Sequence, residues 1–310
     1  MKKRMITVLA AAILFAIALP GCVFAAETEN TAKKTAEETQ AQAPKDGFRV
    51  KNGKTYYYLN GKKVKNKWIE EDGKTYYFDK KGKMVRGKVK TKKTMYYFDD
   101  NGVFLRKIKI KKKMIALTYD DGPSAYTPMI VKELKKVGGR ATFFVVGNRV
   151  NSYKKQMKEA FKAGCEIGNH SWNHANLNTL SAAGIRSQIS KTNTAVKKVT
   201  GVKPAVMRPP YGANNSRVKS TVGMPLITWN VDTLDWKTRS TSATVSHVKN
   251  HHGDGSIILM HDIHRPTAMA AKTIIPWLAK KGYQLVTVSE LADCRGGLKK
   301  GVTYSSFRKK

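Results

Sequence analysis

Residues 117–123 read LTYDDGP, an apolar, strand-like run that stops at two adjacent carboxylates and a Gly-Pro turn. Adjacent side chains of a strand point to opposite faces. Asp120 and Asp121 can therefore share one pocket only if the strand ends there and the chain already turns, which Gly122 and Pro123 allow. Two carboxylates held close together need a metal ion or an arginine beside them. Taken alone, however, the stretch is more typical of an ordinary turn at a strand end.

Four further polar motifs follow, each where an apolar segment ends. His170 and His174 are four residues apart and can converge on one ion, and one Asp with two His is an accepted ligand set for a catalytic zinc-type site. The other three motifs are RPPYG at 208–212, DTLDW at 232–236 and IILMHD at 257–262. Acidic residues are scarce after residue 113, yet the motifs contain Asp120, Asp121, Asp232, Asp235 and Asp262.

In this order and spacing, the five motifs resemble those of the polysaccharide deacetylases of carbohydrate esterase family 4, which share the NodB homology domain. The resemblance covers about residues 113–295. It implies a hydrolase that cleaves carbon–nitrogen (amide) bonds and removes acetyl groups from a polysaccharide. It also implies a fold, a distorted and incomplete (β/α) barrel.

The apolar pattern supports the same α/β fold class. Short apolar segments alternate with amphipathic ones, which is typical of a parallel sheet with crossover helices. About seven such units suggest a barrel, whose chemistry would sit at the carboxyl ends of the strands. The predicted strands are 114–119, 141–146, 166–169, 205–208, 226–229, 256–260 and 284–288. The predicted helices are 127–136, 152–163, 183–199, 243–251 and 268–280.

The resemblance implies a divalent metal ion and a general base. Its metal ligands would be Asp121, His170 and His174, and the ion would lower the pKa of a bound water and polarise the acetyl carbonyl. Asp120 matches the base that takes the proton of that water, and Arg208 matches the residue that keeps this carboxylate ionised. Zinc is the expected metal, although cobalt and manganese also fit such a site.

The remaining motifs match groups that handle the oxyanion, the leaving nitrogen and the sugar. The Tyr211 N–H matches the oxyanion donor. His261 matches the general acid, and Asp235 matches the carboxylate that raises its pKa. No catalytic role is predicted for Asp232 or Asp262. The predicted substrate-binding residues are Tyr211, Trp236, Leu259, Pro209 and Pro210, of which the two prolines stiffen their loop.

The N-terminal residues predict export. Residues 1–26 combine a basic start, an apolar run and small residues at a cleavage position, which is typical of a signal peptide. The alternatives are a lipoprotein, with a lipid on Cys22, and a retained membrane anchor. Residues 27–45 have no aromatic residue and predict a disordered linker. The predicted location of the protein is secreted and associated with a Gram-positive cell wall.

Residues 46–112 form a repeat. The triplets YYY, YYF and YYF recur every 20 residues from Tyr56, each followed by a turn with Gly61, Gly82 or Gly102. This period predicts a small all-β module of stacked hairpins before the catalytic domain at 113–310. The repeats resemble the choline- and glucan-binding repeats of Gram-positive surface proteins. However, Thr or Met replaces the usual Trp before each triplet, which weakens the case for a choline cage.

Charge and cysteines narrow the partners. The chain carries 58 Lys and Arg against 22 Asp and Glu, a net charge of +36. Such a charge attracts polyanions, and for an exported protein these are teichoic acids or anionic lipids. Nucleic acid is not expected, because there is no recognition motif. After signal cleavage, Cys165 and Cys294 remain, either as a disulfide or as two buried thiols.

The substrate is less sharply defined than the reaction. Export and wall-type repeats favour N-acetylglucosamine of peptidoglycan. Chitin oligomers, poly-N-acetylglucosamine and O-acetylated xylan remain alternatives. Tyr211 argues against muramic acid, because deacetylases of that branch tend to carry Arg at this position. The competing class is a wall-binding surface protein with a relic catalytic domain, which would be expected to have lost some of the motif residues.

Overall fold

The computed structural model describes residues 46–308, and the chain divides into two compact units between Lys107 and Ile108. The expected signal peptide, Cys22 and the linker lie outside the described residues. Among the helices within 46–308, none has the length and apolar character needed to cross a bilayer.

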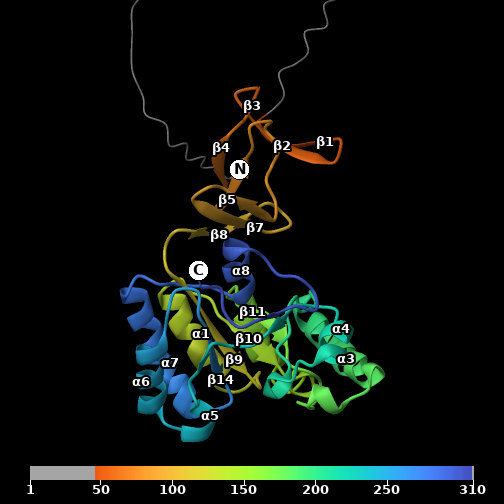
Figure 1. The fold of residues 1–310 in the computed structure, drawn as a ribbon. Coiled ribbons are helices and arrows are strands. Elements are labelled where there is room, and N and C mark those ends of the chain that lie inside the picture. Colours follow the sequence, from red (N-terminus) through yellow and green to blue (C-terminus); the bar gives the residue numbers. More distant parts are fainter. Residues whose placement is uncertain (1–45, 309–310) are drawn as a thin grey trace, which may run out of the picture. The chain divides into compact units, whose positions relative to one another are not determined.

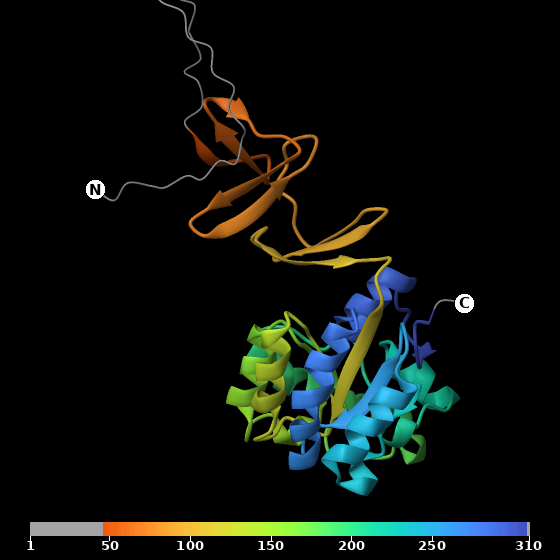
Figure 2. The same cartoon turned by 90° about the vertical axis from the view of Figure 1, so that its left-hand side faces the viewer.

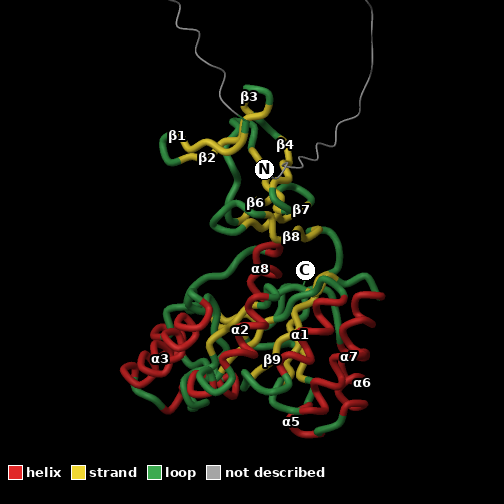
Figure 3. The backbone as a smooth tube through the Cα atoms, turned by 180° about the vertical axis from the view of Figure 1, so that it is seen from behind, coloured by secondary structure: helices red, strands yellow, loops and turns green. Residues whose placement is uncertain are grey.

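The first unit consists of short β-hairpins (Figure 3). The aromatic triplets lie on β2, β5 and β7, as the repeat predicted. Asn52-Gly53 joins the two strands of one hairpin and Asp72-Gly73 those of another, and all four residues have positive φ. This is the turn geometry that fits the twist of a two-stranded hairpin, and Asn-Gly and Asp-Gly favour it. The strands are β1 (Gly47–Lys51), β2 (Lys54–Leu59), β3 (Lys62–Lys63), β4 (Lys67–Glu71), β5 (Lys74–Phe78), β6 (Lys88–Lys90), β7 (Thr94–Phe98) and β8 (Phe104–Lys109).

Aromatic residues of successive hairpins form the core of this unit. Tyr57 and Phe78 are buried together with Val64 and Met84. Trp68 is partly exposed, and its ring contacts the rings of Tyr77, Tyr96, Phe98 and Phe104. A single hairpin has too little apolar surface to be stable alone, so each one depends on its neighbour.

The second unit is built on a parallel sheet with β9 (Met114–Asp120) at its centre (Figures 1 and 2). The strand order is β11-β10-β9-β14-β13, and β15 pairs with the start of β9. All seven residues of β9 are buried, as expected of a strand covered on both faces. The other strands are β10 (Thr142–Val145), β11 (Glu166–Asn169), β12 (Leu226–Ile227), β13 (Val231–Asp232), β14 (Ile257–His261), β15 (Gln284–Leu285) and β16 (Thr303–Tyr304).

Single bridges continue the sheet into a distorted barrel. Met207 pairs with Asn169 of β11 on one side and with Leu226 of β12 on the other. Three residues separate β12 from β13, which pairs with β14. The strands therefore follow one another around a ring, with a break between β12 and β13. The predicted α/β fold with a distorted barrel is confirmed.

Helices surround these strands in both views (Figures 1 and 2). Their predicted positions agree within a few residues, and α1 agrees at both ends. The helices are α1 (Thr127–Lys136), α2 (Lys154–Lys162), α3 (Ala182–Thr200), α4 (Ser216–Thr221), α5 (Asp235–Thr238), α6 (Thr241–His251), α7 (Arg265–Lys280) and α8 (Val288–Arg295), with 3₁₀ turns at Gly147–Arg149, Leu177–Thr179 and Pro210–Gly212.

Two predicted strands came out differently, and the structure decides between the two alternatives for the cysteines. The segment 205–208 is reduced to the bridge at Met207, and 284–288 stops at Leu285. A helix begins there instead, because the Thr287 side chain accepts from Glu290 N–H while the Glu290 carboxylate accepts from Thr287 N–H. Of the two alternatives for the cysteines, both are buried thiols and not a disulfide.

Candidate active site

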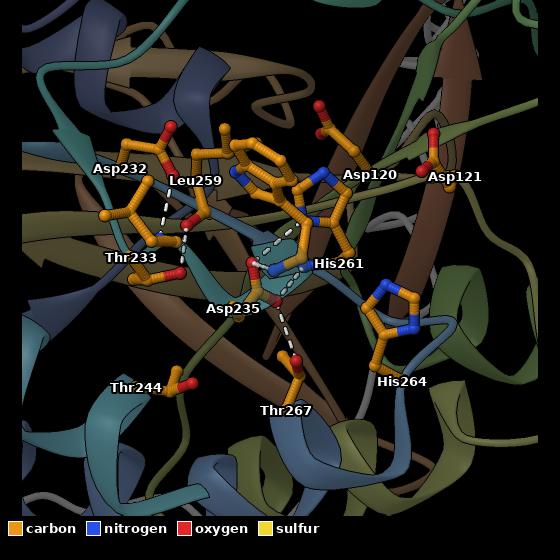
Figure 4. Close-up of polar contacts among 12 residues, drawn as sticks. Asp120, Asp121, Asp232, Thr233, Asp235, Thr244, Leu259, His261, His264 and Thr267 are labelled. Atoms are coloured by element: carbon orange, nitrogen blue, oxygen red, sulfur yellow. Dashed lines mark hydrogen bonds and ion pairs between the residues drawn. The ribbon is translucent and has the colours of Figure 1, made fainter. Parts of the chain in front are cut away.

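The motif residues meet at the carboxyl ends of the central parallel strands. Asp120 ends β9 and His261 ends β14, and the two residues are paired in register across these neighbouring strands. Figure 4 shows Asp120, Asp121, His261 and Asp235 at this edge. Since parallel strands bring their carboxyl ends to one side, residues far apart in sequence become neighbours.

Asp121, His170 and His174 form a candidate metal centre. Their ligand atoms all lie within 4.8 Å of one another. Asp121 Oδ1 is 3.4 Å from His170 Nε2 and 3.2 Å from His174 Nε2. This oxygen is buried and has no hydrogen-bond partner in the described part of the chain, which suits an oxygen aimed at a cation. The set of one carboxylate and two imidazoles fits zinc and similar divalent ions.

Local backbone and neighbouring groups orient these ligands. Asp121 and His174 have φ values of 68° and 61°, so the chain turns sharply at both. His170 Nδ1 donates to the Arg208 carbonyl at 2.6 Å, and His174 Nδ1 lies 3.2 Å from the Tyr211 hydroxyl. These contacts leave both Nε2 atoms directed at Asp121, the usual arrangement of metal-binding histidines. Burial opposes ionisation of Asp121, but the two histidines outweigh it and hold its pKa well below the usual range.

Asp120 is buried against Arg208. Arg208 Nη1 donates to Asp120 Oδ1 at 2.8 Å, and neither side chain is more than 4% exposed. Asp120 Oδ2 lies 3.7 Å from His170 Nε2, so the carboxylate borders the candidate metal centre. The Asp120–Arg208 ion pair therefore lies next to the candidate metal ligands, but Asp120 is not one of these ligands.

Arg208 is fixed by four acceptors and two rings. Besides Asp120, it donates to Thr118 Oγ1 and to the carbonyls of Ile227 and Thr228. Its guanidinium lies 4.3 Å from the ring centre of Phe144 and 5.5 Å from that of Trp229. A planar guanidinium with a fixed fork of donors can satisfy all these contacts at once, which an ammonium cannot.

His261 and Asp235 form a second pair. His261 Nδ1 is 2.9 Å from Asp235 Oδ1, and Asp235 Oδ2 accepts from the His261 N–H and the Thr267 hydroxyl. Burial by itself lowers the pKa of His261, but the hydrogen bond and charge of Asp235 outweigh it and raise the pKa to about 9. His261 is therefore an imidazolium at neutral pH and can give up a proton.

The predicted sugar-binding residues differ in exposure. Tyr211 is 71% exposed and Trp236 is 46% exposed, whereas Leu259 is only 3% exposed. Pro209 and Pro210 are buried. The hydrogen bonds of the RPPYG turn use the N–H groups of Gly212 and Ala213, which donate to the carbonyls of the two prolines. Tyr211 itself has a φ of 59°.

Several supporting residues were not found from the sequence. Thr118 lies two residues before Asp120 on β9, so the period of a strand already placed both on one face. Thr267 and Thr127 gave no such signal. Asp262, for which no role was predicted, is completely buried and accepts from the Thr127 hydroxyl. Burial raises the pKa of Asp262 to about 7.

Known proteins resemble both units. A polysaccharide deacetylase family model matches residues 107–224, and a choline-binding repeat model matches residues 67–107. Peptidoglycan-N-acetylmuramic acid deacetylase PdaC of Bacillus subtilis is 46% identical over 185 residues, 59% of this chain and 40% of that protein. Peptidoglycan-N-acetylglucosamine deacetylase PgdA of Listeria monocytogenes is 44% identical over 180 residues, 58% of this chain and 39% of that protein.

A solved structure is matched over its full length. It is a family 4 acetyl xylan esterase from Clostridium thermocellum in complex with a cobalt ion, at 33% identity and a TM-score of 0.60, covering 64% of this chain and 100% of that one. The chain therefore belongs to the polysaccharide deacetylase family. Residues 67–107 of its hairpin unit are similar to choline-binding repeats. The chain spans only about two fifths of the length of the two peptidoglycan deacetylases, 40% and 39%.

Proposed function

We propose that the protein is a secreted, metal-dependent deacetylase that removes the acetyl group from N-acetylglucosamine in peptidoglycan. One observation carries this proposal. The candidate metal ligands lie beside Asp120, a carboxylate that is held by Arg208. At the same edge of the sheet lies His261, an imidazolium that is held by Asp235. Amide hydrolysis needs both a base for the attacking water and an acid for the leaving nitrogen.

Each of these side chains has a definite task in the proposed reaction. Asp120 takes a proton from the attacking water, and Arg208 donates to this carboxylate and holds it in place. His261 donates a proton to the departing sugar nitrogen, while Asp235 holds the imidazolium in place. The Tyr211 N–H donates to the oxygen that gains charge as the carbonyl is attacked.

A divalent ion held by Asp121, His170 and His174 would supply Lewis-acid chemistry at the acetyl carbonyl. The two imidazoles and one carboxylate favour zinc, and we propose Zn²⁺ as the ion. Cobalt and manganese suit the same ligands, and the Clostridium thermocellum relative was solved with cobalt.

Two sugars of peptidoglycan are candidate substrates. The Listeria relative is named for N-acetylglucosamine and the Bacillus relative for N-acetylmuramic acid. Tyr211 in the RPPYG motif supports N-acetylglucosamine, while the identity of 46% to the Bacillus protein supports N-acetylmuramic acid as a second candidate.

Mass spectrometry of treated peptidoglycan decides between these sugars. Purified sacculi are incubated with the protein and digested to muropeptides, and the masses of the fragments show which sugar has an amine in place of its acetamido group. We expect the loss on glucosamine. Loss of the acetyl group from muramic acid would favour the second candidate. If the sacculi keep all their acetyl groups while acetylated xylan in a parallel assay releases acetate, the proposal is overturned.

We also propose that the hairpin unit holds the protein on the wall through anionic polymers such as teichoic acids. The choline-binding repeat match supports wall attachment. An open pocket of about 290 Å³ supports an anionic ligand, because Lys54, Lys83 and Arg86 line it beside Thr55. Asp79, the one acidic group of the lining, already accepts from the N–H groups of Lys81 and Lys83.

Wall retention of the full chain tests this attachment. We expect Lys83→Gln with Arg86→Gln to reduce retention on walls that contain teichoic acid and to leave acetate release from soluble substrate unchanged. Walls stripped of teichoic acid serve as the control. Equal retention of wild type and variant on both kinds of wall would exclude the basic pocket as the attachment site.

A further inference from the structure

Arg239 occupies a strained position beside the candidate active site. It follows the short helix α5 and has a φ of 50°, and Leu234, which precedes the same helix, has a φ of 53°. Residues other than glycine rarely adopt this left-handed backbone conformation. Such strain persists only where the surroundings hold it, and it is concentrated at functional sites. The helix between them begins with Asp235, the partner of His261.

The guanidinium of Arg239 is fixed close to His261. Its Nε donates to the Trp236 carbonyl at 2.7 Å, and its Nη1 donates to His264 Nδ1. The ring centre of His264 lies 6.1 Å from that of His261, and Figure 4 shows the two side chains at the same edge. Burial and the charge of Arg239 lower the pKa of His264, which suits a neutral ring that accepts from an arginine. One side chain therefore separates Arg239 from the predicted general acid.

The charge of Arg239 has no carboxylate partner among the described residues. Arg140, Arg208 and Arg295 each pair with a carboxylate. Arg239 donates from Nε to a carbonyl and from Nη1 to a neutral ring, which uses two of the five N–H groups of a guanidinium. Arg239 is exposed, and so is nearly half of Trp236, whose backbone carbonyl accepts from it. An anchored, exposed and unpaired guanidinium suits an anionic ligand.

We propose that Arg239 binds a carboxylate of the glycan, carried by the substituent of a sugar next to the one that loses its acetyl group. A guanidinium and a carboxylate form paired, charge-assisted hydrogen bonds. This inference rests on the proposed function and sharpens it. Peptidoglycan carries carboxylates on the lactyl and peptide substituents of its muramic acid, whereas chitin oligomers carry none. Arg239 would thus favour acidic over neutral acetylated glycans.

Kinetics with two matched substrates test the role of Arg239. One is chitotetraose, which is neutral, and the other is a tetrasaccharide of alternating N-acetylglucosamine and N-acetylmuramic acid with free lactyl carboxylates. We expect Arg239→Gln to raise KM for the acidic substrate by about fivefold, the upper end of the effect of losing one ion pair at an exposed site. The kcat values and KM for chitotetraose should stay within about twofold, because Arg239 does not touch the reacting atoms.

Two control variants separate recognition from other effects. Lys237→Gln removes the same charge from α5 two residues earlier and should change KM for neither substrate by more than about twofold. Arg239→Lys keeps the charge but loses the fork and should fall between wild type and Arg239→Gln. In the wild type, added salt should raise KM for the acidic substrate only.

Other outcomes would overturn the inference. If Arg239→Gln lowers kcat or shifts its pH profile equally for both substrates, Arg239 only positions His264 and His261. An equal rise in KM for both substrates would likewise contradict a contact between Arg239 and a carboxylate of the glycan. Calorimetric titration with the same two tetrasaccharides gives the ratio of Kd values without turnover. It therefore tests the inference even if no acetate is released. The absence of acetate release would count against the proposed function and not against the inference.

Discussion

Asp120 and Asp121 are neighbours in sequence, yet their carboxylates meet different partners. Asp120 continues β9 and lies against the buried Arg208. Asp121 turns away with a φ of 68° and faces two imidazoles. The turn that the sequence predicted after the strand therefore gives the two carboxylates different tasks. Asp120 can accept a proton, and Asp121 can bind a cation.

At the same scale, Asp235 should control the pH range of the enzyme. The pKa of His261 is raised to about 9, so its acid form persists up to that pH. Without the Asp235 charge, the pKa should fall toward its ordinary value of about 6.5. We expect Asp235→Asn to move the basic limb of the kcat pH profile down by about two units. Asp232→Asn is the control, and an unchanged limb in Asp235→Asn would contradict this role.

The raised pKa of His261 also determines how the His261–Asp235 pair affects the stability of the fold at different pH. The pKa of His261 is higher in the folded than in the unfolded chain. The stabilisation is therefore complete below about pH 6.5 and is lost as the pH rises through about 9. Urea unfolding at pH 6 and pH 10 should accordingly show a larger loss for Asp235→Asn at pH 6.

Removal of Arg208 should destabilise the fold because it leaves Asp120 buried and unpaired. Loss of one partner of a buried ion pair costs about 3–5 kcal/mol. We expect Arg208→Met to lower the free energy of unfolding by about this amount in urea titrations at pH 7. In an Asp120→Asn background the same change should cost clearly less. Equal costs in both backgrounds would mean that the Asp120 charge is not what Arg208 compensates.

Among the elements, the loop after β9 packs closely against the end of β14. A Cβ on Gly122 would lie 2.3 Å from Asp262 Oδ1, and the Asp262 carbonyl accepts from the Ser124 hydroxyl. The contact joins the loop that carries Asp121 to the segment that carries His261. A side chain at Gly122 must therefore displace the buried Asp262 carboxylate, which accepts from the Thr127 hydroxyl, or move one of these two segments.

We expect Gly122→Ala to weaken both the fold and metal binding. Overpacking of this kind costs about 1–3 kcal/mol, and the displaced Asp121 should bind Zn²⁺ more weakly in a competition titration. Gly184→Ala in α3 is the matched control, because its Cβ would meet atoms only at 3.4 Å and beyond. This control should be neutral or slightly stabilising. Unchanged metal affinity in Gly122→Ala would show that the loop adjusts without moving Asp121.

Much of the element order could be predicted from the sequence, and the exceptions have physical reasons. The period of apolar residues places α1 and β11 at the observed positions. Apolar character alone could not show that 205–208 forms only one bridge, since pairing depends on distant strands. The start of α8 did have a local signal, Thr287 three residues before Glu290, which is the pattern of a capping box.

The candidate site follows the same division. Motif residues are recognisable because chemistry restricts them to carboxylates, imidazoles and an arginine at strand ends. Supporting residues are ordinary in sequence and gain their role only in space. Thr267 donates to Asp235 from α7, and no spacing in the sequence links these two residues.

For the whole molecule, charge should govern encounter with the wall. A net charge of +36 attracts polyanions, and salt screens this attraction. We expect retention of the full chain on purified Gram-positive walls to fall steeply as NaCl rises through about 0.15 M, where charges interact over only about 8 Å. Chitin beads, which are neutral, provide the comparison. Retention that is equal on both and independent of salt would point to sugar contacts instead.

Acetate release from purified peptidoglycan is the most direct test of the central proposal, that Asp120 acts beside a metal held by Asp121, His170 and His174. The full chain is assayed after chelation, after addition of Zn²⁺, and as Asp120→Asn. We expect release that chelation abolishes and Zn²⁺ restores, with the variant slower by about 10²–10⁴-fold. Release that persists after chelation, or at the wild-type rate in folded Asp120→Asn, would contradict the proposed mechanism.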